Sequence, residues 1–369
     1  MKNRKLNVID LFSGIGGLSS HFYNNSNFNL LCANEINPQI AKTFSLNHPD
    51  TKVYVKDIGD LSYQEIYSDF NLNEGDIDII VGGPPCQAYS TVGKRLLTDP
   101  RGMLFQQYFR MLQELKPKFF LFENVTGLLS MKDNLHSHIV DLFKSLGYKV
   151  ESPVLNAIEY GVPQTRRRVI ITGTMLQKSF EYPIGDFSNP KKPLDLINKM
   201  PTRTLSEAIG DLPFISCGEE SINYASGPKN EYQKMMREGA PKYLCDHNAP
   251  KNNEKLIKLM EALPEGGTPK DVQKHLRPSS GFGNSYSRLW WDRPSSTLTR
   301  NFGTPSSSRC IHPKVARALT TREGARIQGF PDHFKFSGSR TSKNLQIGNA
   351  VPPLLSKAIA KKILEHFNS

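Results

Sequence analysis

The stretch from Ile79 to Ser90, IIVGGPPCQAYS, places a single cysteine where its thiol could do chemistry. Pro84 and Pro85 fix two φ angles and remove two backbone N–H donors, so the apolar run must end there and the following loop is stiff. A stiff loop that carries Cys86 at a strand end indicates a thiol directed at a ligand. The alternative is a tight turn with a buried thiol, because a free cysteine commonly behaves as a small hydrophobic residue.

Short apolar runs alternate with helical patterns through the first half of the chain, and these elements must position the thiol. Strands are predicted at 6–12, 29–35, 52–58, 76–83, 118–124 and 168–175, and helices at 16–25, 37–48, 62–70, 103–116, 134–146 and 353–367. Near-continuous apolar strands between helices indicate an α/β fold, with a mostly parallel sheet covered by helices on both faces. Residues 183 to about 340 differ, because Pro, Gly, Ser and Asn are frequent there and helical periods are brief.

Other residues that could bind a ligand or react lie at the ends of successive predicted strands. Ligands of open parallel sheets bind at the carboxyl ends of the strands. The first strand runs into DLFSGIGGLS, whose glycines allow a tight turn and close approach of a ligand. Glu35 follows the second strand, where an acid could hold a ribose hydroxyl, and Asp57 follows the third, where it could accept from an adenine amino group. Cys86 follows the fourth strand and Glu123 ends the fifth.

A nicotinamide-dependent dehydrogenase is the rival class for such a sheet. Its glycine pattern is G-x-G-x-x-G, whereas here Ser19 stands at the place of the last glycine. That class also has no need of a cysteine after two prolines or of an acid at the fifth strand.

Five motifs together resemble the DNA (cytosine-5)-methyltransferase family of the bacterial restriction–modification type. They are DLFSGIGGLS, GGPPCQAYS, FENV, QTRRR (164–168) and QIGNAVPP (346–353), in that order. The resemblance covers residues 6–175 and resumes from about 293 to 369. It implies a Rossmann-like catalytic domain at 1–182, a smaller irregular target-recognition domain and hinge at 183–340, and a C-terminal segment, 341–369, that returns to the catalytic domain. The implied cofactor is S-adenosyl-L-methionine, which yields S-adenosyl-L-homocysteine.

The residue types suit methylation of carbon 5 of cytosine, which is a poor nucleophile. Addition of a thiolate at carbon 6 with protonation of ring nitrogen 3 makes carbon 5 reactive. We expect Cys86 to be the nucleophile and Glu123 to protonate or hydrogen-bond nitrogen 3. By the resemblance, Arg168 holds the carbonyl oxygen of the base, and Arg166 helps to position it and favours the thiolate.

The resemblance also implies a cofactor pocket. Phe12 would pack on the adenine or sugar, Gly14 and Gly16 would admit the methionine portion, and Leu104 with Asn349 would close the pocket. The full expected set is Phe12, Gly14, Gly16, Glu35, Ile36, Asp57, Ile58, Pro85, Leu104, Asn349 and Val351. Ile36 stands where the family often has a bulky aromatic residue, which predicts weaker adenine stacking. No metal is expected, because the five cysteines are scattered without a C-x-x-C pair.

A target base inside a duplex must be flipped out to reach a thiol. The segment GFGNSYSR (281–288) resembles the glycine-rich recognition loop of the family, so Asn284 and Ser285 are candidates for filling the vacated space and Arg288 for a guanine or backbone contact. Thr297, with Leu298, matches the segment that organises the recognition domain. Gln87 and Ser90 complete the expected DNA-binding set, in a lid from Gln87 to about Arg101. Trp290 and Trp291 are predicted to be structural rather than to touch DNA.

The net charge of +12 favours a polyanionic partner. Residues 1–175 carry 18 Lys/Arg and 17 Asp/Glu, residues 176–300 carry 18 and 15, and residues 301–369 carry 11 and 3, so the excesses are +1, +3 and +8. We expect double-stranded DNA as partner, base readout from 183–292, and phosphate contacts from the basic tail, with Arg309 and Lys343 among them.

No apolar stretch is long enough to span a bilayer, and a cytoplasmic prokaryotic enzyme is expected. A monomer is expected, with a cognate restriction endonuclease as a genetic rather than physical partner. Two alternatives remain open. An RNA methyltransferase of the same family is one, although the Cys-Phe-Thr tripeptide of the transfer-RNA branch is absent. An inactive DNA-binding regulator is the other, although Cys86 and Glu123 are both present.

Overall fold

The computed structural model describes residues 4–85, 104–131, 134–192, 198–281 and 283–369. Three predicted site residues, Cys86, Gln87 and Ser90, therefore lie outside the described residues, as does the predicted lid. The chain divides into two compact units, which are described separately. Unit 1 comprises residues 1–156, 167–184 and 355–369, and unit 2 comprises residues 157–166 and 185–354.

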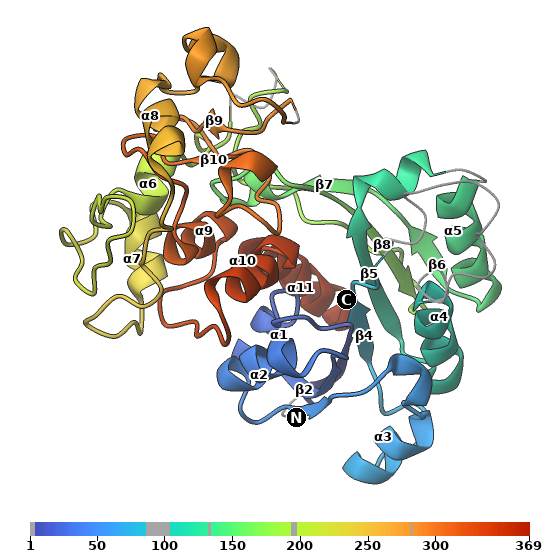
Figure 1. Cartoon of the computed structure of the whole chain (residues 1–369). Coiled ribbons are helices and arrows are strands. Elements are labelled where there is room, and N and C mark those ends of the chain that lie inside the picture. The colour runs from blue at the N-terminus through green and yellow to red at the C-terminus, as the bar shows by residue number, and fades with distance from the viewer. Residues whose placement is uncertain (1–3, 86–103, 132–133, 193–197, 282) are drawn as a thin grey trace. The chain divides into compact units, whose positions relative to one another are not determined.

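Unit 1 is built on a mostly parallel sheet with the order β3-β2-β1-β4-β5-β8-β6, in which β7 also pairs with β8 (Figure 1). The strands are β1 (Leu6–Leu11), β2 (Phe28–Asn34), β3 (Lys52–Tyr54), β4 (Ile79–Gly82), β5 (Phe119–Val125), β6 (Lys149–Glu151), β7 (Val154–Asn156) and β8 (Arg167–Thr174). The first five strands pair in parallel, and β8 is antiparallel to β5, β6 and β7. The predicted α/β class, with a Rossmann-like sheet, is confirmed.

Helices cover both faces of this sheet. They are α1 (Ser20–Asn24), α2 (Pro38–Asn47), α3 (Tyr63–Phe70), α4 (Leu104–Leu115), α5 (Leu135–Ser145) and α11 (Pro353–Asn368). On one face, α3, α4 and α5 enclose a core in which Tyr108, Phe120 and Phe143 meet. On the other face, His366 of α11 packs on Phe119 of β5. Because side chains of a strand alternate between faces, the near-continuous apolar runs read in the sequence follow from this double cover.

The structure departs from the predicted elements at the third strand and beyond the fifth. β3 ends at Tyr54 instead of residue 58, because Asp57 accepts a hydrogen bond from Gly59 N (2.8 Å) and so caps a 3₁₀ turn at Ile58–Asp60. β6 and β7 were not predicted. Each has three residues, and β6 is largely exposed, so neither forms an apolar run.

Unit 2 has few regular elements. It contains α6 (Leu205–Ile209), α7 (Glu231–Arg237), α8 (Glu254–Ala262), α9 (Thr321–Gln328), α10 (Arg340–Asn349), β9 (Ser287–Arg288) and β10 (Arg309–Ile311) (Figure 1). Every residue of α9 is buried, including two arginines and a glutamate. The helix begins with a capping box, in which Thr320 Oγ1 accepts from Glu323 N and the Glu323 side chain accepts from Thr320 N.

The unit boundaries differ from the expected domains in two places. Residues 157–166 and 341–354 belong to unit 2, whereas the expected domains assigned the former to the catalytic part and the latter to the returning segment. Residues 341–354 belong to unit 2 because α10 packs on α9, where Thr321 donates to Asn344 (2.7 Å). The chain returns to unit 1 only at Leu355.

Candidate active site

The register of the unit 1 sheet aligns the carboxyl ends of its parallel strands. Leu11 pairs with Asn34 and with Gly82, Asn34 pairs with Tyr54, and Gly82 pairs with Phe122. The residues just beyond this row are therefore neighbours at one edge of the sheet: Phe12, Glu35, Gly83 and Glu123. Two of the strand-end residues selected from the sequence, Glu35 and Glu123, lie at this edge because of register, which sequence spacing alone does not define.

The glycine turn after β1 is tied to the end of β2. Ser13 N donates to Asn34 O (3.0 Å), and Glu35 accepts from Gly14 N (3.1 Å) and from Asn37 N (2.8 Å). Burial raises the pKa of Glu35 above its ordinary value, although the two amide hydrogen bonds oppose this shift. Gly16 has φ +85°, and a Cβ there would lie 2.3 Å from His48 Cε1, so both backbone and space require glycine.

Three further residues of the expected cofactor set are displayed around this turn. Phe12 has φ 57°, a left-handed conformation that is uncommon for a bulky residue and is often found at functional sites. Ile36 is 61% exposed, so its apolar surface is available to a ligand. Asp57 is exposed, but one of its oxygens already caps the 3₁₀ turn.

Ile58 is a different case, because it is buried in the core beside Leu61 and Ile66. The structure therefore gives Ile58 a packing role. Of the remaining unit 1 positions, Pro85 is exposed and Leu104 is half-buried at the start of α4.

Glu123 and Arg168 form an ion pair at the end of β5. Arg168 Nε lies 2.7 Å from Glu123 Oε1, and the side chains are only 11% and 12% exposed. The antiparallel pairing of β5 with β8 sets Arg168 opposite Val125, two residues beyond Glu123. Gly83 adjoins the carboxylate, since a Cβ at Gly83 would lie 3.1 Å from Glu123 Oε2. The acid and the arginine that the sequence assigned to the target base are thus held together near the end of β4.

Asn124 is a functional candidate that sequence reasoning missed. It is buried, its Nδ2 donates to Pro84 O (3.0 Å), and its Oδ1 accepts from Val125 N (2.9 Å). Pro84 and Pro85 have no N–H groups, so this segment can be held only through its carbonyls. The signal in the sequence for Asn124 was its position directly after Glu123 in the FENV motif.

Arg166 lies in unit 2 and is 1% exposed. Its guanidinium donates to Leu298 O (3.1 Å) and Gly348 O (2.7 Å). These contacts give Arg166 a role in joining two segments of unit 2, and the prediction that it helps to position the base stays a prediction. Asn349 is exposed at the end of α10, whereas Val351 is buried.

Gln164 and Gln328 extend this polar network. Gln164 Nε2 donates to Gln328 Oε1 (2.6 Å), and Gln164 Oε1 accepts from Leu298 N (2.8 Å). Gln328 Nε2 in turn donates to Ile347 O and Ala350 O. The motifs QTRRR and QIGNAVPP are therefore connected through buried amides, so part of each motif is structural.

The expected DNA-binding residues of unit 2 separate into exposed and buried ones. Asn284 and Thr297 are exposed, although Thr297 Oγ1 donates to Thr165 O (2.6 Å). Ser285 is buried and donates to Ser306 O (2.7 Å). Arg288 is 6% exposed and donates to the carbonyls of His312, Pro313, Val315 and Met260.

The predictions that Ser285 and Arg288 contact DNA stay predictions, and both side chains are engaged within unit 2 in this structure. A buried arginine whose guanidinium serves four carbonyls organises its neighbours, and a guanine contact would break those bonds. Asn284 remains the exposed polar side chain of this loop that suits contact with DNA.

The two tryptophans make structural contacts. The Arg309 guanidinium lies 4.3 Å from the centroid of the Trp290 ring, and Trp290 packs so closely on Gly266 that an added Cβ would clash. Trp291 stacks edge-on with Phe214 at 5.5 Å. These contacts favour the structural role that the sequence suggested.

The basic tail is largely engaged inside unit 2. Arg317 forms a bidentate pair with Glu323 (2.8 and 2.7 Å), and Arg326 pairs with Asp332 and Asp211. These arginines are fully buried, as is Arg322. Their buried charges cannot meet phosphates, so these three arginines do not supply the phosphate contacts expected of the tail.

The two tail residues named for phosphate contact are also engaged. Lys343 pairs with Asp246 (2.5 Å), and Arg309 donates to Gly266 O and Arg288 O. Sequence charge alone did not reveal these partners, which lie far away in the chain.

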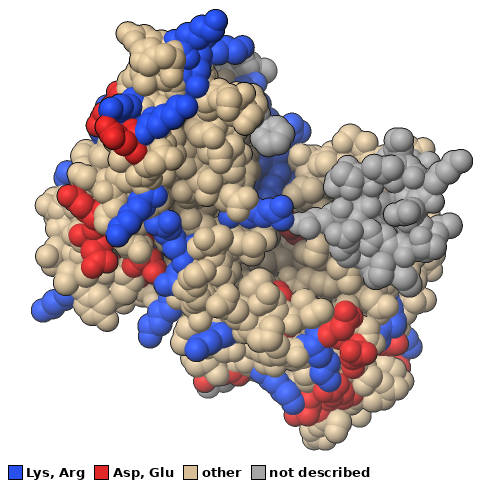
Figure 2. Space-filling view, in the orientation of Figure 1, with Lys and Arg blue, Asp and Glu red and all other residues tan. Residues whose placement is uncertain are grey.

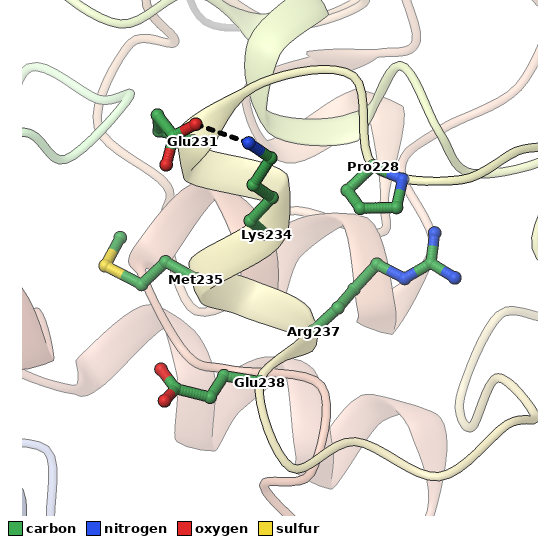
Figure 3. Close-up of a pocket in the computed structure, with 6 residues that line it drawn as sticks. All are labelled: Pro228, Glu231, Lys234, Met235, Arg237 and Glu238. Atoms are coloured by element: carbon green, nitrogen blue, oxygen red, sulfur yellow. Dashed lines mark hydrogen bonds and ion pairs between the residues drawn. The ribbon is translucent and has the colours of Figure 1, made fainter.

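A hollow of about 520 Å³ lies beside α7, with side chains from that helix around it (Figure 3). Two of its cations are already paired, Lys234 with Glu231 at 2.6 Å and Arg237 with Asp211 at 3.3 Å. It offers no reactive group. Within the described residues, no three His, Cys, Asp or Glu side chains form a cluster suited to a metal ion, and no helix is long and apolar enough to cross a membrane.

Comparison with known proteins agrees with this geometry. Residues 6–365 match the family described as C-5 cytosine-specific DNA methylase. The chain belongs to this family. The Type II methyltransferase M.DdeI of Desulfomicrobium norvegicum is 37% identical over 99% of the chain and 90% of that protein. M1.HphI of Haemophilus parahaemolyticus is 34% identical over 98% of the chain and 87% of its own length.

Solved structures support the fold as well. A prophage-encoded protein of E. coli superposes with a TM-score of 0.77 at 27% identity, over 99% of this chain and all of that one. DNMT2 of Spodoptera frugiperda gives a TM-score of 0.65 at 16% identity, over 98% of this chain and 100% of that one, which supports the fold alone.

The protein is thus a DNA (cytosine-5)-methyltransferase that uses S-adenosylmethionine. The residues of unit 1 fit this cofactor, because the edge of the sheet offers a partly buried acid, a left-handed glycine turn and an exposed apolar side chain at Ile36. When bound, the cofactor supplies an electrophilic methyl group. The assignment of Glu35 to the ribose hydroxyls and of Ile36 to the adenine stays a prediction.

Proposed function

We propose that this methyltransferase modifies a flipped-out cytosine in duplex DNA through a transient covalent bond to Cys86. The observation that carries the proposal is the Glu123–Arg168 pair at the end of β5, beside the turn at Gly83 and Pro84 that leads to the cysteine. An acid and a guanidinium at one point can address both ring nitrogen 3 and the neighbouring carbonyl oxygen of cytosine.

The proposed reaction begins when the Cys86 thiolate adds to carbon 6 and Glu123 gives a proton to nitrogen 3. The electron pair displaced from the ring makes carbon 5 nucleophilic, and carbon 5 takes the methyl group. Loss of the carbon 5 proton to solvent then restores the ring double bond, expels the thiolate and lets Glu123 recover its proton. Arg168 holds the carbonyl oxygen throughout and keeps the carboxyl group of Glu123 oriented.

Asn124 has a positioning role in this proposal. It fixes the Pro84 carbonyl two residues before the nucleophile, where the prolines leave no amide that could do so. Misplacement of a reacting atom by about 1 Å can cost on the order of 100-fold in rate.

On the DNA side, exposed Asn284 is proposed to enter the space that the flipped base leaves. We further propose that the enzyme acts as a monomer and protects its site from a restriction endonuclease. The Type II methyltransferase names of the two relatives motivate the latter.

RNA is the competing substrate class. Labelled cofactor, duplex DNA and transfer RNA in parallel assays decide between them, and bisulfite sequencing of methylated plasmid identifies the site. Methyl transfer to transfer RNA without transfer to DNA would overturn the proposal.

The covalent step is tested with a duplex that carries 5-fluorocytosine at the target. Wild-type enzyme with cofactor should form an adduct that survives denaturation, because the fluorine cannot leave as a proton does. Cys86→Ser should form none, while Cys245→Ser, which changes an exposed cysteine of unit 2, should behave as wild type. Asn124→Ala should form the adduct more slowly with unchanged cofactor affinity. An adduct in Cys86→Ser would exclude this thiol as the nucleophile.

A further inference from the structure

A hollow of about 260 Å³ lies in unit 2 among four separate stretches of chain. Its walls include Lys251 and Asn252 before α8, residues 303–306, and Arg340 at the start of α10. We call it the Lys251–Arg340 groove. Figure 2 shows Lys and Arg side chains exposed over this unit on the face in view.

The lining of the Lys251–Arg340 groove is suited to an anion. Lys251 and Arg340 supply two positive charges, while Tyr286, Thr304 and Ser306 bring hydroxyl groups. Neither Asp nor Glu is among the lining residues. Arginine, lysine, hydroxyl and amide donors are the groups through which proteins bind phosphate oxygens.

The side chains of the two cations are not neutralised by any carboxylate that the structure describes. Among the described residues, neither Lys251 nor Arg340 has a hydrogen-bond or ion-pair partner, whereas Lys343 and Lys314 are paired with carboxylates. The stem of Lys251 packs on Gly218, where an added Cβ would lie 3.3 Å from Lys251 Cγ. Folding therefore already restricts this side chain, so it loses less conformational entropy when an anion binds.

The groove is also fixed to the glycine-rich loop at 281–288. Tyr286 N donates to Pro305 O (2.6 Å), and Ser285 Oγ donates to Ser306 O (2.7 Å). The wall of the groove and the loop that displays Asn284 are therefore held together. An anion in the groove lies next to the loop proposed to approach the flipped base.

We propose that the Lys251–Arg340 groove binds a phosphate of the DNA backbone and sets the position of the 281–288 loop on the duplex. This inference rests on the proposed function, since it takes DNA as the substrate. Of the basic tail, the groove uses Arg340, whereas Arg317 and Arg326 are buried in ion pairs. Contacts to phosphate carry no sequence information, so the groove contributes equally on any duplex.

The test is the salt dependence of DNA binding by Lys251→Gln, Arg340→Gln and the double variant. Each lost phosphate contact lowers the slope of log Kobs against log salt by about 0.9. Each single variant should therefore lose about three- to fourfold more affinity at roughly 50 mM than at roughly 200 mM salt, on cognate and one-base-altered duplexes alike. Because both cations address the same phosphate, the double variant should lose about 0.9 of slope in total and no less than either single variant.

Lys258→Gln is the matched control. It removes the same charge from α8, but Lys258 is paired with Glu254 at 2.7 Å and does not line the groove, so its slope should equal that of the wild type. Lys251→Arg should retain the slope as well, since the charge stays. Thermal unfolding of every variant shows whether it is folded. If one glutamine variant is misfolded, the other glutamine variant and Lys251→Arg still test the proposal.

Unchanged slopes in both glutamine variants would overturn the proposal, and so would an affinity loss confined to the cognate duplex. Free phosphate ions are the alternative ligand of the groove, and inorganic phosphate is the probe for them. If it protects the wild type but not the double variant from heat while the slopes stay equal, the groove binds free anions and not DNA. Methyl transfer by the wild type in the same preparations separates these failures from failure of the proposed function.

Discussion

The two units use charged side chains in opposite ways. Unit 1 has an apolar core in which aromatic rings such as Phe120 and Phe143 pack, and its ionisable pair Glu123–Arg168 stands at the end of a strand. Unit 2 has buried ion pairs at its centre, around α9. Arg168 of unit 1 stands at a strand end, whereas Arg317, Arg322 and Arg326 of unit 2 lie buried and hold its segments together.

The difference follows from the amount of regular structure. A sheet with helices on both faces satisfies its backbone internally and can bury a continuous apolar surface. Unit 2 has long irregular segments whose carbonyls need donors, and Arg288, Arg317 and Arg322 supply them. A charge count therefore indicates a DNA-binding surface only after the buried arginines have been subtracted.

The largest expected effect is on the chemistry of unit 1. Glu123→Gln should lower kcat by about 10²–10⁴-fold, the usual contribution of a proton-transferring side chain, with little change in unfolding temperature. Glu114→Gln is the matched control, since Glu114 also pairs with an arginine (Arg110, 2.8 Å) but on the helix α4. Single-turnover methyl transfer measures both. A Glu123→Gln rate within tenfold of wild type would mean that Glu123 does not address the ring.

A change in the ion pairs of unit 2 should affect stability instead. Glu323→Gln leaves Arg317 buried without its partner and should cost about 3–5 kcal/mol of unfolding free energy. Burial alone would raise the pKa of Glu323, but Arg317 lowers it below its ordinary value.

The lowered pKa of Glu323 sets the direction in which the stability of unit 2 depends on pH. The ion pair stabilises the fold above the unfolded-state pKa, and the contribution is lost as pH falls. Urea unfolding at several pH values should show this loss in the wild type and a flatter profile in Glu323→Gln. Equal stability of the two proteins at neutral pH would refute a structural role for the pair.

Asp10 is the exception in unit 1, and the smallest effect is expected there. It is buried on β1, and both carboxylate oxygens lack a hydrogen-bond partner within the described residues. Burial raises the pKa of Asp10 from 3.8 to about 7. The folded state then holds a proton that the unfolded state has lost, so stability decreases as pH rises from about 4 to 7.

Asp10→Asn should remove this decrease and gain at most about 4 kcal/mol above pH 7, three pKa units at about 1.4 kcal/mol each. Urea unfolding without cofactor at about pH 5, between the two pKa values, and at about pH 8, above the folded-state pKa of about 7, measures most of it. A wild type that is more stable at the higher pH would contradict an uncompensated acid at this position.

The sequence was sufficient for the fold class and for the order of the strand-end residues. Continuous apolar runs predicted parallel strands, and Glu35 and Glu123 were recognised because each directly follows such a run. β6 and β7 escaped because a three-residue edge strand has no periodicity to read. Asn124 escaped because its importance comes from Pro84, forty positions away in the chain.

What the sequence determined by itself is the chemistry that the chain can offer: a thiol after two prolines, an acid at the fifth strand and a glycine turn at the first. Local residue order carries that information, because strands, turns and motifs depend on neighbours in the chain. Only the tertiary structure decided which arginines are available. Arg166, Arg288 and Arg326 look like Arg168 in sequence, but their partners come from distant segments, and burial forces a guanidinium to be satisfied where it lies.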